Sequence, residues 1–437
     1  MNQTLKFTDI IAVGFTLFAF FLGAGNIIFP PLAGQLAGEH ILPAMLGFLL
    51  TAVGLPLMTI VAIAVSGGSW EHLTRDLPKR ISVVMAVLIF VIIGPAFAAP
   101  RTGLVAYEMG VKPFFAHPTQ MYLTIFSIVF FAIAMFLSWS QGKLIDAIGK
   151  VLTPILVLGL LALGLAVFID PQGEILAAHA QYITEPLTKG FLEGYNTMDT
   201  LGALMFGMLM VDTLRCRGIT EPKATTKYLI RAALIAAGGL AFVYVSLFYL
   251  GATSSSVAAG ADNGGTVLSL YVQSLFGPYG QLALSLIVLL ACLTTSIGLI
   301  SSCSDYFSTL TSISYKAWVV IVGVVCAVVA NIGLAQLISL SVPVLYALYP
   351  VAIVLVVLTF IRKKLPNPQA SYRVALLVSF IFSLLDAMKA AGVDVSAFKF
   401  IPLFDIGMGW ALPSVIAIFL MFFVRGSAQE MQEAEQM

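Results

Sequence analysis

Charged residues are scarce in this chain of 437 residues. Only 10% of the residues are Asp, Glu, Lys or Arg, whereas 60% are hydrophobic; a typical soluble domain is roughly 25% charged. A soluble fold of this size could not bury so much apolar surface, and a disordered chain would be more polar. The net charge of +1 creates no field that would attract a nucleic acid. The composition therefore indicates a protein of the lipid bilayer.

Histidine and cysteine are also scarce. The four histidines all lie in predicted loops, and the four cysteines have a spacing that suggests neither a disulfide framework nor a metal site. An intramembrane enzyme would need a nucleophile–base pair or a metal dyad inside the spans. A channel would show pore loops or rings of charge. Because neither pattern is present, we expect no enzyme and no cofactor.

Apolar runs long enough to cross a bilayer, about 20 residues each, recur along the chain. Because backbone groups in lipid must be satisfied internally, and the alternating short strands of a barrel are missing, these runs predict an all-α polytopic membrane protein. The first run is too long for a signal peptide and is read as a retained span. The predicted spans number about twelve: 9–37, 42–66, 81–108, 120–138, 147–169, 191–212, 228–252, 279–303, 316–334, 340–361, 373–390 and 407–425.

The positions of the basic residues predict the orientation. With twelve spans, 17 of the 22 Lys and Arg residues lie on the side of the two termini, four lie on the other side, and Arg101 lies within a span. Loops rich in Lys and Arg remain in the cytoplasm. We therefore predict cytoplasmic N- and C-termini.

Two spans contain segments that weaken a helix. In the first span, Gly23-Ala24-Gly25-Asn26 interrupts the apolar run and Pro30-Pro31 follows. In the sixth, residues 194–204 have glycines near both ends, polar side chains between them and one carboxylate, Asp199. We predict two half-helices joined by an unwound stretch in each span, with the prolines in the first turn of a new helix. The alternative is that the glycines only allow close helix packing.

Breaks in spans 1 and 6 are typical of a transporter built from two inverted five-helix repeats. The boundaries would be 9–169 for the first repeat and 191–361 for the second, with two further helices over 373–425. These parts form one transmembrane domain, 1–425, followed by a flexible tail, 426–437. Half-helix N-termini attract an anion and exposed carbonyls attract a cation. This arrangement suits a zwitterion together with Na⁺, and a carboxylate inside a span is a functional hypothesis by default.

Three hydroxyl residues, Thr294-Thr295-Ser296, interrupt the apolar eighth span. Two interpretations remain open. The hydroxyls can bond back to carbonyls of their own helix. Alternatively, Thr294 and Thr295 form, with the carbonyl of Ala291, a set of neutral oxygen ligands suited to reversible Na⁺ binding.

Two other charged positions within spans have competing interpretations. Arg101 in span 3 is a possible gate or pathway residue, or pairs with Asp199 or Glu108, or extends its side chain to the outer surface. Asp386 in span 11 is expected to pair with Lys389, three residues on.

The broken first span and the span 8 motif resemble those of Na⁺-coupled amino-acid transporters with the leucine-transporter (LeuT) fold. The chain as a whole resembles the bacterial branched-chain amino acid:cation symporters of the BrnQ, or LIV-II carrier, type. The stretches that carry this resemblance are 9–11, 23–31, 37–40, 100–102, 197–202 and 341–345.

The resemblance implies uptake of leucine, isoleucine and valine across the bacterial inner membrane, driven by Na⁺ or in some relatives by H⁺, through alternating access. Another small neutral amino acid as substrate, or a non-transporting sensor of the same fold, is the alternative.

The resemblance also implies which residues bind. The implied Na⁺ ligands are the carbonyls of Ala19, Leu22 and Ala291 and the hydroxyls of Thr294 and Thr295. The implied substrate site consists of Gly23, Ala24, Gly25, Asn26, Thr197, Asp199, Thr200 and Gly202. Asn26 matches a ligand of a second Na⁺ in the wider fold, but Asp199 departs from the neutral hydroxyl pattern there, and faces the substrate ammonium or a proton instead.

Overall fold

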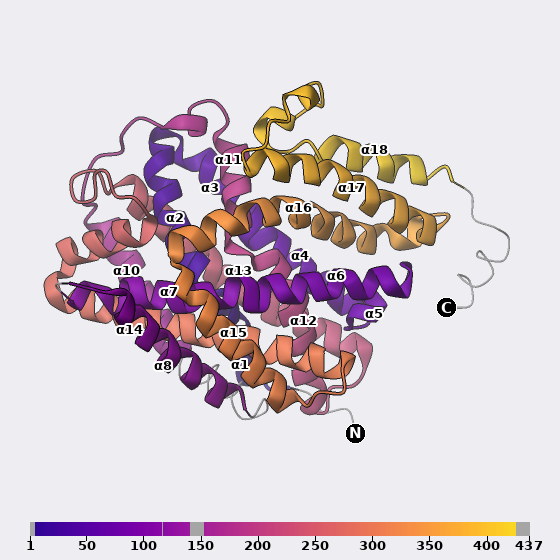
Figure 1. Ribbon diagram of the computed structural model, residues 1–437, viewed down its shortest axis with the longest axis horizontal. Helices are drawn as coiled ribbons and strands as arrows, with labels where there is room; N and C mark the ends of the chain where they lie inside the picture. Colours follow the sequence, from indigo (N-terminus) through magenta and orange to yellow (C-terminus); the bar gives the residue numbers. More distant parts are fainter. Residues whose placement is uncertain (1–4, 116, 140–152, 425–437) are drawn as a thin grey trace. The chain divides into compact units, whose positions relative to one another are not determined.

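The computed structural model describes residues 5–115, 117–139 and 153–424. All regular secondary structure in these ranges is helical (Figure 1), which confirms the predicted all-α class. The α-helices are α1 (Phe7–Phe21), α2 (Ala24–Ala37), α3 (Ile41–Leu49), α4 (Leu55–Ser66), α5 (Trp70–Leu73), α6 (Lys79–Val91), α7 (Ala98–Gly110), α8 (Gln120–Ser138), α10 (Thr153–Ile169), α11 (Pro186–Glu193), α12 (Asp199–Cys216), α13 (Pro222–Ala252), α14 (Gly264–Leu310), α15 (Tyr315–Val329), α16 (Leu334–Ile361), α17 (Pro368–Ala390) and α18 (Ala411–Met421).

Several continuous runs of these helices can cross a bilayer, by length and composition. Within the described ranges, eight continuous helical runs are long and apolar enough, or nine if the pair that bends by 44° before α12 forms one span. The helices α1, α10 and α18 are shorter but apolar. A helix overlaps each of the twelve predicted spans, and the count of twelve stays a prediction. The start of the fifth predicted span, the predicted tail 426–437 and the basic residues Lys143, Lys150 and Arg425 lie outside the described residues.

The first predicted break is present between α1 and α2. Leu22 has a ψ of 80°, and Gly23 has φ −114° and ψ −160°, so the chain leaves the helical conformation for two residues. The Asn26 side chain then caps the new helix, because its Oδ1 accepts a hydrogen bond of 3.2 Å from the N–H of Gly23. With this acceptor in place, helix resumes at once at Ala24.

The break is therefore shorter than predicted. Pro30 and Pro31 lie inside α2 and not in its first turn, so that expectation was wrong. A proline within a helix has no N–H to offer the carbonyl four residues earlier. In α2 these carbonyls belong to Asn26 and Ile27, so the turn that follows the break lacks two ordinary helical donors.

The second predicted break lies between α11 and α12. Helix α11 continues into the 3-10 turn η7 (Gly194–Thr197), and Met198 then adopts a left-handed conformation with φ 63° and ψ 12°. A residue other than glycine is uncommon in this region. The Oγ1 of Thr197 accepts a hydrogen bond of 3.3 Å from the N–H of Asp199, the first residue of the helix that follows.

The described part of the chain also contains two π-helical turns, and the first of them packs against the second break. The turn η2 (Leu50–Gly54) lies between α3 and α4, and its Thr51 hydroxyl donates to the carbonyl of Phe191 on α11 at 2.8 Å. The turn η3 (Ile92–Ala96) lies between α6 and α7 and contains Gly94, whose φ of −80° and ψ of −114° are not helical. Such turns are frequent at functional sites. Here they interrupt the helical runs α3–α4 and α6–α7.

The chain forms two compact units. The first consists of residues 1–64 and 88–338, and the second of residues 65–87 and 339–437. In the first unit, α13 packs along α1 and α2, and α14 packs along α7 and α2. Both breaks lie in this unit.

The second unit contains a bidentate ion pair and a helix cap. Arg362 donates to both carboxylate oxygens of Asp76, at 2.6 and 3.1 Å. Asp386 accepts hydrogen bonds of 3.3 and 3.2 Å from the N–H groups of Gly409 and Trp410, just before α18.

The predicted pair of Asp386 with Lys389 is therefore not formed. The Lys389 ammonium donates to the carbonyls of Phe404 and Asp405 instead, at 3.1 and 2.9 Å. The loop before α18 folds back onto α17, and its backbone groups supply separate hydrogen-bond partners to Asp386 and to Lys389.

Candidate functional site

The two broken segments meet each other. A Cβ atom added at Gly25 would lie 3.0 Å from the carbonyl oxygen of Asn196 and 3.2 Å from Cα of Thr197. Only a residue without a side chain allows the start of α2 to approach η7 this closely. The backbones of the two broken segments are therefore in direct contact.

A small cavity lies where the breaks meet. Its volume is about 30 Å³, which is room for about two water molecules, so an amino acid requires the lining to open further. Eight of the predicted binding residues line it: Gly23, Ala24, Gly25, Asn26, Thr197, Asp199, Gly202 and Thr295. The other lining residues are Phe20, Phe21, Ile93, Ala98, Arg101, Thr102, Met198, Phe206 and Leu299.

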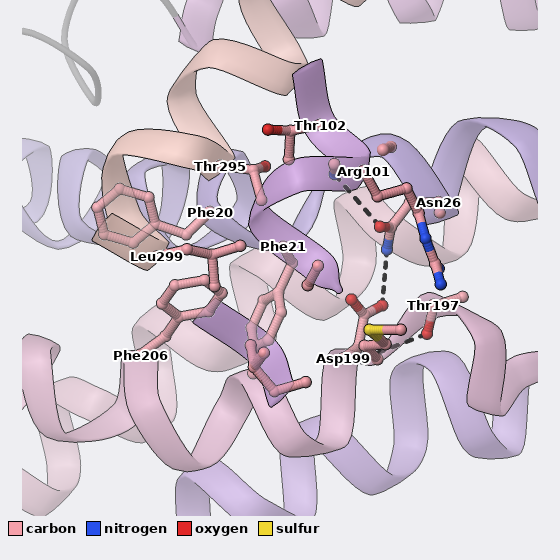
Figure 2. Close-up of a pocket in the computed structure, with 17 residues that line it drawn as sticks. Phe20, Phe21, Asn26, Arg101, Thr102, Thr197, Asp199, Phe206, Thr295 and Leu299 are labelled. Carbon is pink, nitrogen blue, oxygen red and sulfur yellow. Dashed lines mark hydrogen bonds between the residues drawn. The ribbon is translucent and has the colours of Figure 1, made fainter. Parts of the chain in front are cut away.

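The cavity has a polar end and an apolar end. Figure 2 shows Asn26, Thr197 and Asp199 on one side, with Arg101 near them. Phe20, Phe206 and Leu299 lie on the opposite side, where the rings of Phe20 and Phe206 stack with centroids 5.3 Å apart. This arrangement fits a small molecule with a charged head and an apolar tail.

Asp199 is the acidic residue at the polar end. It is only 4% exposed, and it is the first residue of α12, where the helix dipole favours a negative charge. Its Oδ2 accepts hydrogen bonds of 2.7 Å from Nδ2 of Asn26 and from the hydroxyl of Tyr244. Asn26 also donates to the Tyr244 hydroxyl oxygen. Three helices, α2, α12 and α13, are therefore joined at one carboxylate oxygen.

Four of the five predicted cation ligands also come together. The Thr294 hydroxyl lies 2.9 Å from the carbonyl of Ala291 and 3.3 Å from that of Ala19, and the Thr295 hydroxyl lies 3.1 Å from the Ala19 carbonyl. Oxygen atoms gathered in this way suit a hard monovalent cation. The Thr294 hydroxyl bonds back to its own helix, as the first interpretation expects, and it also reaches α1. The interpretation as a cation site stays a prediction. The fifth predicted ligand, Leu22, lies in the break that follows α1.

Gly23 brings the cation ligands and the cavity together. A Cβ atom at this position would lie 2.9 Å from Cγ2 and 3.0 Å from Oγ1 of Thr295. The break thus touches α14 at the residue that faces the Ala19 carbonyl.

Arg101 extends into the cavity and not to the surface. It is 2% exposed, and its guanidinium donates to the carbonyl of Asn196 in η7 at 2.7 Å. The same group lies 5.5 Å from the centre of the Phe29 ring on α2. The structure therefore contradicts the interpretation in which this side chain reaches the outer surface.

A second cavity begins on the other side of this contact. It measures about 910 Å³ and is lined by residues of α2, α7, the start of α14 and the segment 332–338. Phe29 lines this larger cavity, whereas Arg101 lines the small one. Their contact accordingly lies between the two spaces.

Some predicted residues lie just outside the cavity, and some site residues were not predicted. Thr200 is buried in α12 but does not line it. Tyr244 and the Phe20–Phe206 wall were missed, since an aromatic residue in an apolar span has no distinctive signal in the sequence. The Asn196 carbonyl accepts the hydrogen bond from Arg101. Asn196 lies in the predicted break of span 6, but it was not among the predicted site residues.

Comparison with known proteins identifies the family. The model of a family described as branched-chain amino acid transport protein matches residues 6–428. The chain belongs to this family. A branched-chain amino acid transport system 2 carrier protein of Pseudomonas aeruginosa is 46% identical over 95% of the chain and 96% of the relative. The branched-chain amino acid permease BraB of Bacillus subtilis is 43% identical over 95% of each, and BrnQ of Escherichia coli is 41% identical over 96% of each.

Solved structures support the fold of this family member. A Na⁺-coupled sialic acid symporter superposes with a TM-score of 0.63 at 16% identity, covering 96% of this chain and 91% of the other. A nucleobase-cation-symport-1 family transporter superposes with a TM-score of 0.56 at 15% identity, covering 98% and 96%. The predicted LeuT-like fold, with discontinuous first and sixth spans, is thereby confirmed for this branched-chain amino acid transport protein.

Proposed function

We propose that this protein carries leucine, isoleucine and valine into the cell across the bacterial inner membrane, coupled to Na⁺, by alternating access. The observation that carries the proposal is the amphipathic cavity at the meeting point of two broken helices, in a chain of the branched-chain amino acid transport family. An amino acid with an aliphatic side chain has the same division into a charged head and an apolar tail.

The head of the substrate binds at the polar end. The substrate carboxylate lies against the backbone of Gly23, Ala24 and Gly25. The N–H groups of Ala24 and Gly25, in the first turn of α2, face it, as helix N-termini do for anions. Asp199 faces the ammonium group. The opposite charges of a zwitterion are thus met by the ends of two different helices, so binding draws the two breaks together.

The tail of the substrate lies against Phe20, Phe206 and Leu299. An apolar pocket distinguishes side chains that differ by one methylene by only about 1–3 kcal/mol. One pocket can therefore accept leucine, isoleucine and valine with modest preference.

Sodium couples to the substrate through Gly23. A Na⁺ held by the oxygens of Ala19, Leu22, Ala291, Thr294 and Thr295 fixes α1 to α14 beside the break. Since Gly23 touches Thr295, the cation stabilises the arrangement that binds substrate. The coupling is reciprocal, so leucine raises the affinity for Na⁺ by the same factor.

Arg101 and Phe29 form a gate in this scheme. Their contact lies between the small cavity and the larger one, which by the predicted orientation opens to the outside. Separation of the guanidinium from the ring connects the two spaces, and closure of the contact isolates the substrate from the outer solution.

Uptake of radiolabelled leucine by proteoliposomes tests the proposal. Imposed Na⁺ and pH gradients separate the two candidate coupling ions, and valine, isoleucine, alanine and phenylalanine serve as competitors. Accumulation above equilibrium distinguishes a carrier from a sensor that only binds leucine, and counterflow distinguishes it from a channel. If no aliphatic amino acid is taken up, the proposed function is wrong.

A double variant tests the cation site. Thr294→Ala combined with Thr295→Ala removes two of the five oxygens. Na⁺-driven leucine uptake should then be lost at the Na⁺ concentrations that saturate the wild type. Ser308→Ala, at the far end of α14, is the matched control that removes a hydroxyl outside the site. Unchanged Na⁺-dependent uptake in the double variant would show that the cation binds elsewhere.

A further inference from the structure

Tyr244 on α13 contacts residues that line the cavity but does not line the cavity itself. Its side chain is fully buried. Its hydroxyl donates to Oδ2 of Asp199 at 2.7 Å and accepts from Nδ2 of Asn26. These two neighbours, both of which line the cavity, connect Tyr244 to the site.

We propose that Tyr244 is a positioning residue that orients Asp199 toward the ammonium group of the substrate. This inference rests on the proposed function and deepens it. With Asn26, Tyr244 holds one carboxylate oxygen, Oδ2, in a fixed place. The orientation of the carboxylate is then set before substrate arrives.

The packing around the Tyr244 ring fixes the position of its hydroxyl. The ring meets Phe48 edge-to-face, with centroids 5.2 Å apart at an interplanar angle of 80°, and Phe48 in turn meets Phe248 at 5.1 Å. A ring enclosed in this way has few alternative rotamers. The hydroxyl is accordingly a fixed donor, which loses little conformational freedom when Asp199 accepts from it.

The hydrogen bonds around Asp199 form a closed triangle with a consistent set of donors. Asn26 donates to Tyr244 and to Asp199, and Tyr244 donates to Asp199. Hydrogen bonds in such a chain strengthen one another in a medium of low dielectric constant. The triangle also joins α2 and α12, the helices that follow the two breaks, to α13. Tyr244 thus supports the direct hydrogen bond between Asn26 and Asp199 from a third helix.

The test compares ligands that differ only in the group that faces Asp199. Leucine and 2-hydroxy-4-methylpentanoate have the same carboxylate and side chain, but the second carries a hydroxyl in place of the ammonium group. Binding of each to purified full-length protein, by calorimetry or by competition, gives a discrimination ratio for the amine. Leucinol, which keeps the amine and lacks the carboxylate, reports on the other end of the site.

The variant Tyr244→Phe removes the hydroxyl and keeps the ring. A hydrogen bond to a charged group contributes about 1.5–3 kcal/mol, so the amine discrimination ratio should fall by about 12-fold to 150-fold. The ratio of leucinol to leucine and the preference among leucine, isoleucine and valine should stay within about threefold of wild type. Tyr249→Phe is the matched control, because this residue lies on the same helix and stacks on Phe168 instead.

Two further variants separate positioning from a structural role. In the background of Asp199→Asn, Tyr244→Phe should have no further effect on the ratio, because the residue acts through the carboxylate. Replacement of Tyr244 by 4-aminophenylalanine keeps the ring and an N–H donor, and should retain the wild-type ratio within about threefold. If the Tyr244→Phe protein is not monodisperse, the 4-aminophenylalanine variant tests the proposal on its own. Loss of the amine discrimination ratio in that variant overturns the proposal.

Several results would refute the role of Tyr244. An unchanged ratio in Tyr244→Phe, an equal loss of affinity for leucine and the hydroxy acid, or an additive loss in the double variant would each do so. Failure of the proposed function is distinguishable, since wild-type protein would then bind none of the aliphatic ligands in the same assay.

Discussion

The contact between Gly23 and Thr295 gives a sharp prediction about coupling. In Gly23→Ala, the added methyl would lie 2.9 Å from Cγ2, 3.0 Å from Oγ1 and 3.2 Å from Cβ of Thr295. These distances are well inside van der Waals contact, and Thr295 belongs to the packed helix α14. The break must then move away from α14, and the distance between the Thr295 hydroxyl and the Ala19 carbonyl, now 3.1 Å, must increase.

The size of the effect follows from the cost of overpacking. An extra methyl group in a close-packed site costs about 1–3 kcal/mol, which is roughly 5-fold to 150-fold in an equilibrium constant. Because the strain falls between the cation ligands and the cavity, we expect the Na⁺ concentration for half-maximal leucine uptake to rise by about that factor. Replacing Thr295 by Ser in the same protein removes Cγ2 and keeps the hydroxyl, so Gly23→Ala with Thr295→Ser should recover part of the affinity.

Leucine uptake by proteoliposomes, measured over a range of Na⁺ concentrations, checks this expectation. Gly238→Ala is the control, since a Cβ atom there meets nothing within 4 Å and the substitution favours a helix. If Gly23→Ala behaves like Gly238→Ala, the break does not transmit cation binding to the substrate, and the coupling scheme is wrong.

Two further predictions concern the apolar wall and the second unit. Phe206→Leu replaces the ring that stacks on Phe20 with a smaller side chain. The added apolar room should improve the ability of phenylalanine to compete with leucine, by up to about 10-fold. Unchanged competition would show that the substrate side chain binds elsewhere. Arg362→Gln leaves Asp76, whose side chain is 7% exposed, without its bidentate partner, and should destabilise the protein by about 1–3 kcal/mol. A thermal melt in detergent measures this, and an unchanged midpoint would contradict it.

The helix breaks were predictable because their signals are local. Two glycines and an asparagine in an apolar run disfavour helix wherever the segment lies, and the structure places a break there. The position of Pro30 and Pro31 was not predictable in the same way. It depends on the Asn26 side chain, which supplies the acceptor that lets α2 begin before the prolines.

The surroundings of charged and aromatic side chains were much harder to predict. The sequence places Arg101 in a span but does not say whether its side chain points to the surface or to η7. The π-helical turn just before α7 rotates the residues that follow it about the helix axis, and this rotation is not visible in the spacing of the sequence. Tyr244 lies in an ordinary apolar helix, and its partners are 45 and 218 residues away along the chain. Asp386 shows the same limit, because its partners lie in a loop that folds back from α18. A spacing within one helix predicts which partner is possible, but tertiary packing decides which one is used.

The scarcity of charge agrees with the chemistry of the site. The cavity contains one acidic side chain, Asp199, and one basic side chain, Arg101, and each is held by hydrogen bonds to the broken helices. A charge at this depth is costly unless it is paired or hydrogen-bonded. In the proposed scheme, the substrate is a zwitterion with one charge of each sign, and the helix N-termini and a single carboxylate suffice to receive it. Further ionised side chains would add a desolvation cost in each proposed cycle without a group on the substrate to bind, so the proposal assigns most of the binding to backbone groups, hydroxyls and aromatic rings.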